Sequence, residues 1–252
     1  MKFIKHLCIA ILFLGIFNES FAQVKKDSLR ILFVGNSYTF ISNMPHLVSQ
    51  ISDSTNVKLI TTQSVAGGAR LSEHWHGEKG LKTKEIITKG KYDIVVLQEY
   101  SMGAILDKED FFKYSKKLSD LVKSTGAKPF LYTTWARQKV PQYQETITKT
   151  YQQAAKENDC GLIEVGEAWK LARSLRPDFQ LFMLDGSHQS DLGAFLTACV
   201  FVGNFSREIP ENLSASYSVL DGNGERVILF WEKALDVIFC QKVASKFINS
   251  IN

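Results

Sequence analysis

Five short runs of apolar residues, mostly β-branched or aromatic, recur along the chain with a longer stretch after each of them. The runs are Leu29–Val34, Val57–Thr62, Asp93–Leu97, Pro129–Thr133 and Gly161–Val165. Continuous apolar runs of this length are typical of strands that are buried on both faces of a parallel sheet. Because parallel neighbours need long crossover connections, the alternation predicts an α/β chain.

The stretches between these runs carry apolar residues at helical spacing. The periodic residues are Phe111, Tyr114, Leu118, Leu121 and Val122 in one stretch, and Tyr143, Ile147, Tyr151 and Ala154 in another. Later helices are expected over Leu192–Phe201 and Ala234–Ile251, and a surface excursion over Pro210–Arg226, which is rich in Asn, Ser and Gly. The pattern predicts a doubly wound, three-layer α/β/α sandwich with a flavodoxin-like, five-stranded parallel sheet.

The N-terminal residues have the pattern of a cleaved secretory signal. Lys2 and Lys5 precede the apolar run Leu7–Phe17, and Ser20 and Ala22 place small residues where a signal peptidase reads. The run is shorter than the roughly 18 residues of a membrane-spanning helix, so a membrane anchor is the weaker alternative. We therefore predict a signal peptide over residues 1–22, a single domain over residues 23–252, a secreted or periplasmic location, and no stable membrane insertion after cleavage.

Charge and cysteine content exclude several classes of function. The net charge is +4, with no dense block of Lys and Arg to track a phosphate backbone, so no nucleic-acid partner is expected. Apart from Cys8 in the apolar run, the cysteines are Cys160, Cys199 and Cys240, widely spaced and without a Cys-x-x-Cys pair. They predict neither a disulfide framework nor a zinc site, and Cys199 and Cys240 are expected to be buried. The sequence leaves the oligomeric state open.

Polar and glycine-rich segments follow the predicted strands at their carboxyl ends, which is where open α/β sheets bind ligands. These segments are Gly35-Asn36-Ser37-Tyr38, Ala66-Gly67-Gly68-Ala69-Arg70, Gln98-Glu99-Tyr100-Ser101 and Trp135-Ala136-Arg137, and the late segment Asp185-Gly186-Ser187-His188 joins them.

Three residues of these segments can supply nucleophilic catalysis. A serine hydroxyl needs a base to take its proton, and the base needs an acidic partner to orient it. Ser37 lies at a tight turn after the first strand, and Asp185 and His188 are close enough in one loop for the carboxylate to reach the imidazole. Backbone N–H groups at the Gly67-Gly68 pair could stabilise an oxyanion, although a plain tight turn is the alternative.

On these residues the sequence resembles the SGNH hydrolases, also called GDSL-type esterases. Gly35-Asn36-Ser37 is similar to the first block of that family, and Asp185-Gly186-Ser187-His188 is similar to the fourth in spacing and position. Gly67 or Gly68 matches the oxyanion glycine of the second block, and the choice between them stays open. The resemblance implies a serine esterase with Ser37, His188 and Asp185 as its catalytic residues and no metal or organic cofactor.

The third block departs from the family pattern. The family places Gly-x-Asn after the third strand, whereas this chain has Gln98-Glu99 there, as a secreted bacterial subgroup of the family often does. Gln98 is the candidate for the missing oxyanion donor, because its side-chain amide offers N–H groups on a longer arm. The alternative is that Gln98 is held at the end of the strand for packing.

Candidate substrate-binding residues are Trp75, Trp135 and Arg137, since they follow predicted strands and could overhang a cleft. Aromatic faces at these positions would suit a sugar ring, and packing in the core or at its rim is the alternative. His74 and His76 flank Trp75 and could form a metal pair, but two histidines alone are weak evidence for a site, so no metal is expected.

The expected function is a secreted serine esterase that hydrolyses acyl esters, with acetyl esters of carbohydrates as the narrower expectation. A lipase or thioesterase of the same fold is the rival enzyme and would need an apolar acyl cleft. A carbohydrate-binding module that has lost turnover is the non-enzymatic rival. A flavin or phosphate binder is disfavoured, since the first loop has no glycine-rich cradle and no Lys or Arg beside Ser37.

Overall fold

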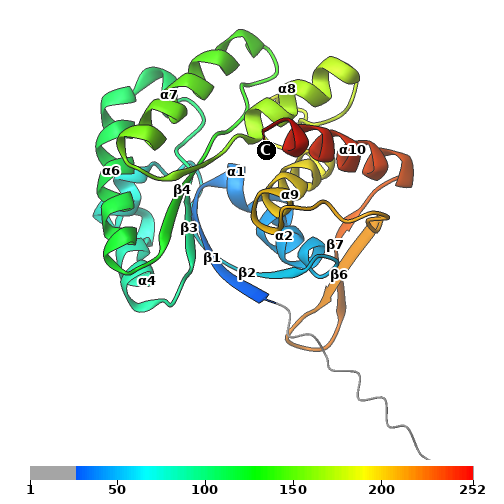
Figure 1. The fold of residues 1–252 in the computed structure, drawn as a ribbon, viewed down its shortest axis with the longest axis horizontal. Helices are drawn as coiled ribbons and strands as arrows, with labels where there is room; N and C mark the ends of the chain where they lie inside the picture. The colour runs from blue at the N-terminus through cyan, green and yellow to red at the C-terminus, as the bar shows by residue number, and fades with distance from the viewer. Residues whose placement is uncertain (1–26, 252) are drawn as a thin grey trace, which may run out of the picture.

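Five parallel strands form the central sheet of the computed structural model, which describes residues 27–251 (Figure 1). Their order is β2-β1-β3-β4-β5, as expected for a flavodoxin-like sheet. The strands are β1 (Asp27–Gly35), β2 (Val57–Val65), β3 (Ile94–Leu97), β4 (Lys128–Tyr132) and β5 (Gly161–Ile163). The predicted fold class is confirmed, with strand ends that shift by a few residues. The predicted signal peptide, residues 1–22, lies outside the described residues.

Helices cover both faces of the sheet because successive strand residues point to opposite sides. Ile31 and Phe33 of β1 join one apolar cluster, and Leu32 and Val34 join the other. The first cluster is covered by α2 (Met44–Ser52), α8 (Val165–Leu175), α9 (Asp191–Ser206) and α10 (Ala234–Ile251), and the second by α3 (Leu71–His76), α4 (Thr83–Lys89), α6 (Lys108–Ser124) and α7 (Gln144–Glu157). Short elements complete the chain: α1 (Ser37–Phe40), α5 (Gly103–Leu106) and the 3₁₀ helices Ile41–Asn43, Glu78–Gly80 and Pro141–Tyr143.

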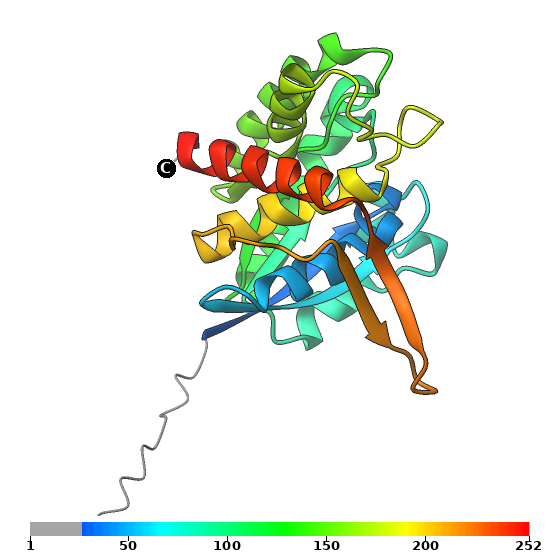
Figure 2. The same ribbon diagram turned by 90° about the vertical axis from the view of Figure 1, so that its right-hand side faces the viewer.

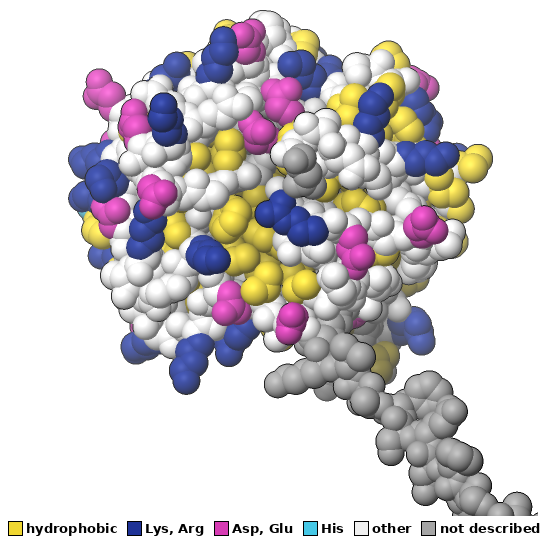
Figure 3. All heavy atoms as spheres, in the orientation of Figure 1, with side chains coloured by type: hydrophobic (Ala, Val, Ile, Leu, Met, Phe, Trp, Pro, Cys, Tyr) yellow, Lys and Arg dark blue, Asp and Glu magenta, His cyan; other side chains and the backbone are white. Residues whose placement is uncertain are grey.

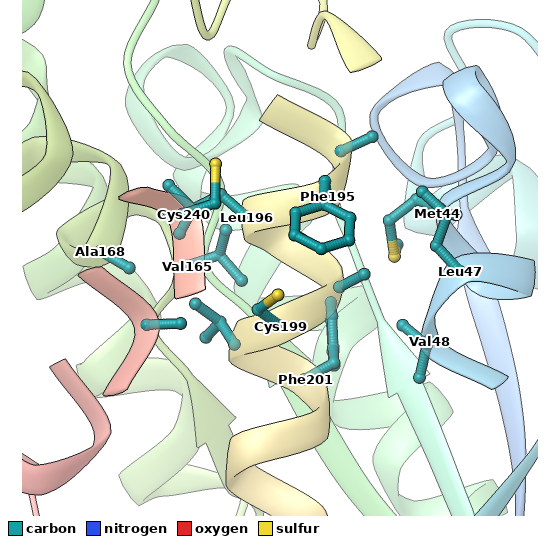
Figure 4. Packing of buried hydrophobic residues seen from close by; sticks show 14 of the residues in the cluster. Met44, Leu47, Val48, Val165, Ala168, Phe195, Leu196, Cys199, Phe201 and Cys240 are labelled. Carbon is teal, nitrogen blue, oxygen red and sulfur yellow. The ribbon is translucent and has the colours of Figure 1, made fainter. Parts of the chain in front are cut away.

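Helix α9 is the centre of the larger cluster. Its residues from Leu192 to Val202 are all buried, which is why the helix is apolar all round. Figure 4 shows Phe195 and Cys199 of α9 between α2 on one side and Cys240 of α10 on the other. Cys199 and Cys240 are buried and unpaired, as predicted. Over residues 27–251 no helix is both long enough and apolar enough to cross a membrane.

An antiparallel hairpin of β6 (Ser216–Leu220) and β7 (Arg226–Trp231) corrects the plain surface excursion predicted for Pro210–Arg226. The hairpin projects from the helical layers (Figure 2). It is anchored by the buried Phe230, and by Gln50 Nε2, which donates to the carbonyl oxygen of Ser218 at 2.9 Å. β6 has no continuous apolar run, whereas β7 has one, Val227–Trp231, of which only Phe230 is buried.

Charged side chains of both signs are interspersed over the face seen in Figure 3. Lys and Arg lie beside Asp and Glu there, so the described residues of this face form no charged track of one sign.

Candidate active site

Ser37 begins α1 directly after the turn that ends β1. Asn36 caps this helix, with its Oδ1 accepting a hydrogen bond from the backbone N–H of Tyr38 at 3.0 Å. The Asn36 Nδ2 donates to the carbonyl oxygen of Ala69 at 2.9 Å, which ties the turn to the glycine loop. A Cβ on Gly35 would lie 2.6 Å from Gln98 Oε1, so this position needs glycine for close packing.

Ser37, His188 and Asp185 form a hydrogen-bonded series. His188 Nε2 lies 2.8 Å from Ser37 Oγ, and His188 Nδ1 lies 2.5 Å from Asp185 Oδ2. The other carboxylate oxygen of Asp185 accepts from the backbone N–H groups of Ser187 (2.9 Å) and His188 (3.0 Å). The structure thus brings together the three residues that the sequence predicted as catalytic, in the order nucleophile, base and orienting acid.

The carboxyl group of Asp185 stays ionised over the whole range of ordinary pH. Its hydrogen bond to His188, supported by the backbone N–H of Ser187, lowers the pKa of Asp185 to about 2. A permanent carboxylate here accepts the Nδ1–H of His188 and leaves the Nε2 lone pair to face Ser37.

Trp135 supports the loop that carries Asp185 and His188. Its Nε1 donates to the carbonyl oxygen of Ser187 at 2.9 Å, and its ring stacks between Tyr38, at 4.8 Å, and Trp169, at 3.8 Å. The Tyr38 hydroxyl lies 2.7 Å from Ser187 Oγ. Only 1% of Trp135 is exposed. The predicted contact of Trp135 with substrate is therefore corrected to a packing role, the alternative that the sequence left open.

Gln189 is a residue of the site that the sequence analysis missed. It is fully buried, and its Nε2 donates to the carbonyl oxygens of Ser37, Tyr38 and Ile41 at 3.1–3.3 Å. These bonds fix the nucleophile helix to the residue that follows His188. The only signal for this role in the sequence is the position of Gln189 next to the catalytic histidine.

Gln98 lies behind the nucleophile turn and does not reach the pocket. Its Oε1 accepts from the backbone N–H of Asn36 at 3.1 Å and from the Thr39 hydroxyl at 2.9 Å, and its Nε2 donates to the carbonyl oxygen of Glu99. Since the amide is buried and Gln98 is not among the residues that line the cavity at Ser37, it is not placed to donate to an oxyanion. The prediction that Gln98 lies in the oxyanion hole is therefore corrected: Gln98 holds the turn around Ser37 through its bonds to Asn36 and Thr39.

Glu99 joins the two loops on either side of the turn. Its buried carboxylate accepts from the backbone N–H of Leu71 at 3.2 Å and of Tyr100 at 2.7 Å. Burial raises the pKa of Glu99 to about 7, although the two N–H groups and the nearby Arg70 act in the opposite direction. Gln98 and Glu99 therefore position the turn and the two loops and do not line the cavity.

His74 and Trp75 lie away from the nucleophile's pocket. His74 is buried between Thr83 Oγ1, at 2.7 Å, and the carbonyl oxygen of Gly35, at 3.0 Å, and burial lowers its pKa to about 4. The ammonium groups of Lys84 and Lys117 lie over the ring of Trp75, which packs against the second apolar cluster. Trp75 does not line the cavity at Ser37, so its predicted substrate contact is also corrected to packing. His76 Nε2 lies 2.9 Å from the Tyr114 hydroxyl. Within residues 27–251 no cluster of three His, Cys, Asp or Glu side chains could hold a metal ion.

A cavity of about 260 Å³ opens at Ser37 and His188. Gly68 lines it and Gly67 does not, so of the two glycines Gly68 is the one placed to face a bound ester. Gly68 has a φ of 61°, in the left-handed region that favours glycine. The lining residues are Asn36, Ser37, Tyr38, Gly68, Tyr100, Ser101, Arg137, Ser187 and His188. Arg137 is thus the one predicted substrate-binding residue that the structure places at the pocket.

Solved structures of other proteins share this fold. A protein from Slackia heliotrinireducens, assigned by its description to the SGNH hydrolases, is 26% identical with a TM-score of 0.61, over 71% of this chain and 100% of that chain. A DUF4886 family protein from Bacteroides uniformis is 17% identical with a TM-score of 0.67, over 88% of this chain and 95% of that one. An acetyl xylan esterase is 15% identical with a TM-score of 0.56, over 70% and 99%. No protein-family model and no curated protein matches the chain.

Proposed function

We propose that this chain, a member of the SGNH/GDSL-type family, is a serine hydrolase that cleaves carboxylic esters through an acyl-enzyme. The observation that carries the proposal is the series from Ser37 Oγ through His188 to Asp185, with separations of 2.8 and 2.5 Å, at the opening of a cavity. A nucleophile, a base within reach of its proton and an acid that orients the base are the parts that acyl transfer needs.

The reaction follows from these positions. His188 Nε2 takes the hydroxyl proton as Ser37 Oγ bonds to the ester carbon, and Asp185 stabilises the imidazolium that forms. The oxyanion takes hydrogen bonds from backbone N–H groups of Ser37 and Gly68. His188 then returns the proton to the leaving alkoxide as the carbon–oxygen bond breaks. A water molecule repeats the same steps on the acyl-Ser37 ester, and releases the carboxylic acid.

The pocket favours a short acyl group, acetyl above all, on a polar alcohol such as a carbohydrate. No aliphatic side chain lines the cavity, whereas the hydroxyl-bearing residues Tyr100, Ser101 and Ser187 do. A lipase or thioesterase would need an apolar wall along a long acyl chain. Neither Trp75 nor Trp135 lines the cavity, so they give no support for stacking on a sugar ring. The proposal of a carbohydrate alcohol is therefore supported by the hydroxyl-bearing residues alone.

An extracytoplasmic location is part of the proposal. Its support is the sequence of residues 1–22, in which Lys2 and Lys5, the run Leu7–Phe17 and the small Ala22 have the pattern of a signal peptide.

Nitrophenyl esters of increasing chain length test the function with the mature protein. We expect turnover of the acetyl ester, a falling kcat/KM as the chain lengthens, and no turnover by Ser37→Ala. Activity that rises with chain length would favour the lipase. A complete absence of turnover would reject the esterase in favour of a binding protein.

A further inference from the structure

Arg137 brings a positive charge to the pocket without a carboxylate of the protein beside it. It follows β4, is exposed and lines the same cavity as Ser37 and His188. Its Nη2 donates to the neutral hydroxyl of Ser101 at 3.0 Å. Among the described residues no Asp or Glu forms an ion pair with Arg137.

The neighbouring Arg70 shows the contrast. Its Nη1 lies 3.1 Å from Asp107 Oδ2, and its guanidinium lies over the ring of Tyr100, 4.4 Å from the centroid. The charge of Arg70 is therefore compensated within the protein. The charge of Arg137 is therefore available to a ligand that enters the cavity.

The strand order places this charge close to the reacting ester. Gly68, Ser37, Ser101 and Arg137 follow β2, β1, β3 and β4, which are neighbours in that order. Two strand spacings separate Arg137 from Ser37, about 10 Å between backbones. The bond to Ser101 shows that the guanidinium reaches back across the end of β3, toward Ser37. It therefore lies on the side of Ser37 opposite to Gly68, within the length of a small substrate.

A guanidinium presents five N–H donors in a planar fork that matches a carboxylate, and one contact to Ser101 leaves most of them available. Resting on the proposed function, we propose that the substrate is an ester whose alcohol part carries a carboxylate, bound by Arg137. The carboxylate belongs to the alcohol because an acetyl group has none. The substrate class is thus an O-acylated hydroxy acid, sugar acids included, and Arg137 is its specificity-determining residue.

A matched pair of esters tests the proposal: 3-acetoxybenzoate, which carries a carboxylate on the alcohol part, and the neutral 3-acetoxybenzamide. We expect the ratio of their kcat/KM values to be about tenfold higher for the wild type than for Arg137→Gln, as a charge-assisted hydrogen bond would give. The change should lie in KM for the benzoate and shrink as salt is added. Arg137→Lys, which keeps the charge without the fork, should fall between the two.

Lys139→Gln is the matched control, since it removes a positive charge from the same loop but outside the cavity, and it should keep the wild-type ratio. A ratio that Arg137→Gln leaves unchanged would overturn the proposal. If both esters lost activity equally, Arg137 would act on the transition state of any ester; if neither lost activity, Arg137 would not contact the substrate.

Calorimetry separates this proposal from the proposed function. Binding of 3-acetoxybenzoate to Ser37→Ala, and its loss in Ser37→Ala/Arg137→Gln, would support the anion site even if neither ester were hydrolysed. Binding that does not depend on Arg137, or no binding to Ser37→Ala, would overturn the anion site even if both esters were turned over.

Discussion

Gln98 Oε1 accepts a hydrogen bond from the backbone N–H of Asn36, 3.1 Å away, and so joins the end of β3 to the residue that precedes the nucleophile. The same oxygen accepts from the hydroxyl of Thr39, which lies in α1 two residues after Ser37. The buried amide of Gln98 thus fixes the turn that carries Ser37 without lining the cavity.

Replacement of Gln98 by Ala should therefore reduce both stability and turnover. The change leaves the N–H of Asn36 and the hydroxyl of Thr39 buried without their acceptor, which costs about 1–3 kcal/mol per group in the free energy of unfolding. Urea unfolding and kcat on nitrophenyl acetate measure the two effects. Thr39→Val, which keeps the bond to Asn36, should show a smaller loss in each. A Gln98→Ala variant that lost kcat at full stability would instead indicate a direct role in catalysis.

Glu99 should make the stability of the protein depend on pH. Its pKa is raised from 4.5 to about 7, so its contribution to the free energy of unfolding is complete below pH 4.5 and is lost as the pH rises through 7. Relative to Glu99→Gln, the wild type should lose roughly 3 kcal/mol over this range. Denaturant unfolding of both proteins at a series of pH values measures the difference. A difference that stays constant with pH would show that the pKa of Glu99 is not raised in the folded protein.

Trp135→Phe should destabilise the protein and leave KM for nitrophenyl acetate nearly unchanged. The variant loses the hydrogen bond to Ser187 and part of the stacking between Tyr38 and Trp169, with an expected cost of about 1–3 kcal/mol. Thermal unfolding and steady-state kinetics separate the two readouts. A higher KM at unchanged stability would instead indicate that Trp135 contacts the substrate.

Ser37 and His188 should behave as one unit. Each alanine variant should lower kcat by several orders of magnitude, and the double variant should be barely worse, because either change removes the same activated nucleophile. Asp185→Ala should cost less, since this residue only orients and stabilises the imidazole. Losses that multiply in Ser37→Ala/His188→Ala would mean that the two residues act independently.

The parts of the fold that depend on burial could be predicted from the sequence. Runs such as Leu29–Val34 have no polar residue to place on a solvent face except Arg30, and α9 is apolar all round, so both indicated buried elements. The β6–β7 hairpin was not predicted in this way. β7 contains the apolar run Val227–Trp231, but most of that run is exposed and β6 has no such run, so hydrophobicity and burial do not coincide in this hairpin.

The three candidate catalytic residues could be singled out because their spacing is local: Ser37 follows a strand, and Asp185 and His188 share one loop. The roles of Gln98 and Trp135 could not, because each depends on the direction of a side chain. Gln98 stands at the correct strand end but points toward Asn36, and Trp135 is covered by rings from distant segments. Strand position therefore predicted that Ser37 and Arg137 lie at the cavity, whereas contacts between distant segments decide that Gln98 and Trp135 do not line it.

The central claim, that Ser37 is a nucleophile activated by His188, is tested most directly by covalent labelling with a fluorophosphonate. Attack by Ser37 Oγ on phosphorus displaces fluoride and leaves one stable adduct. Intact-protein and peptide mass spectra should show a single label on Ser37 in the wild type, none in Ser37→Ala, and much slower labelling in His188→Ala. A label on another residue, or equal labelling of the wild type and Ser37→Ala, would contradict the account.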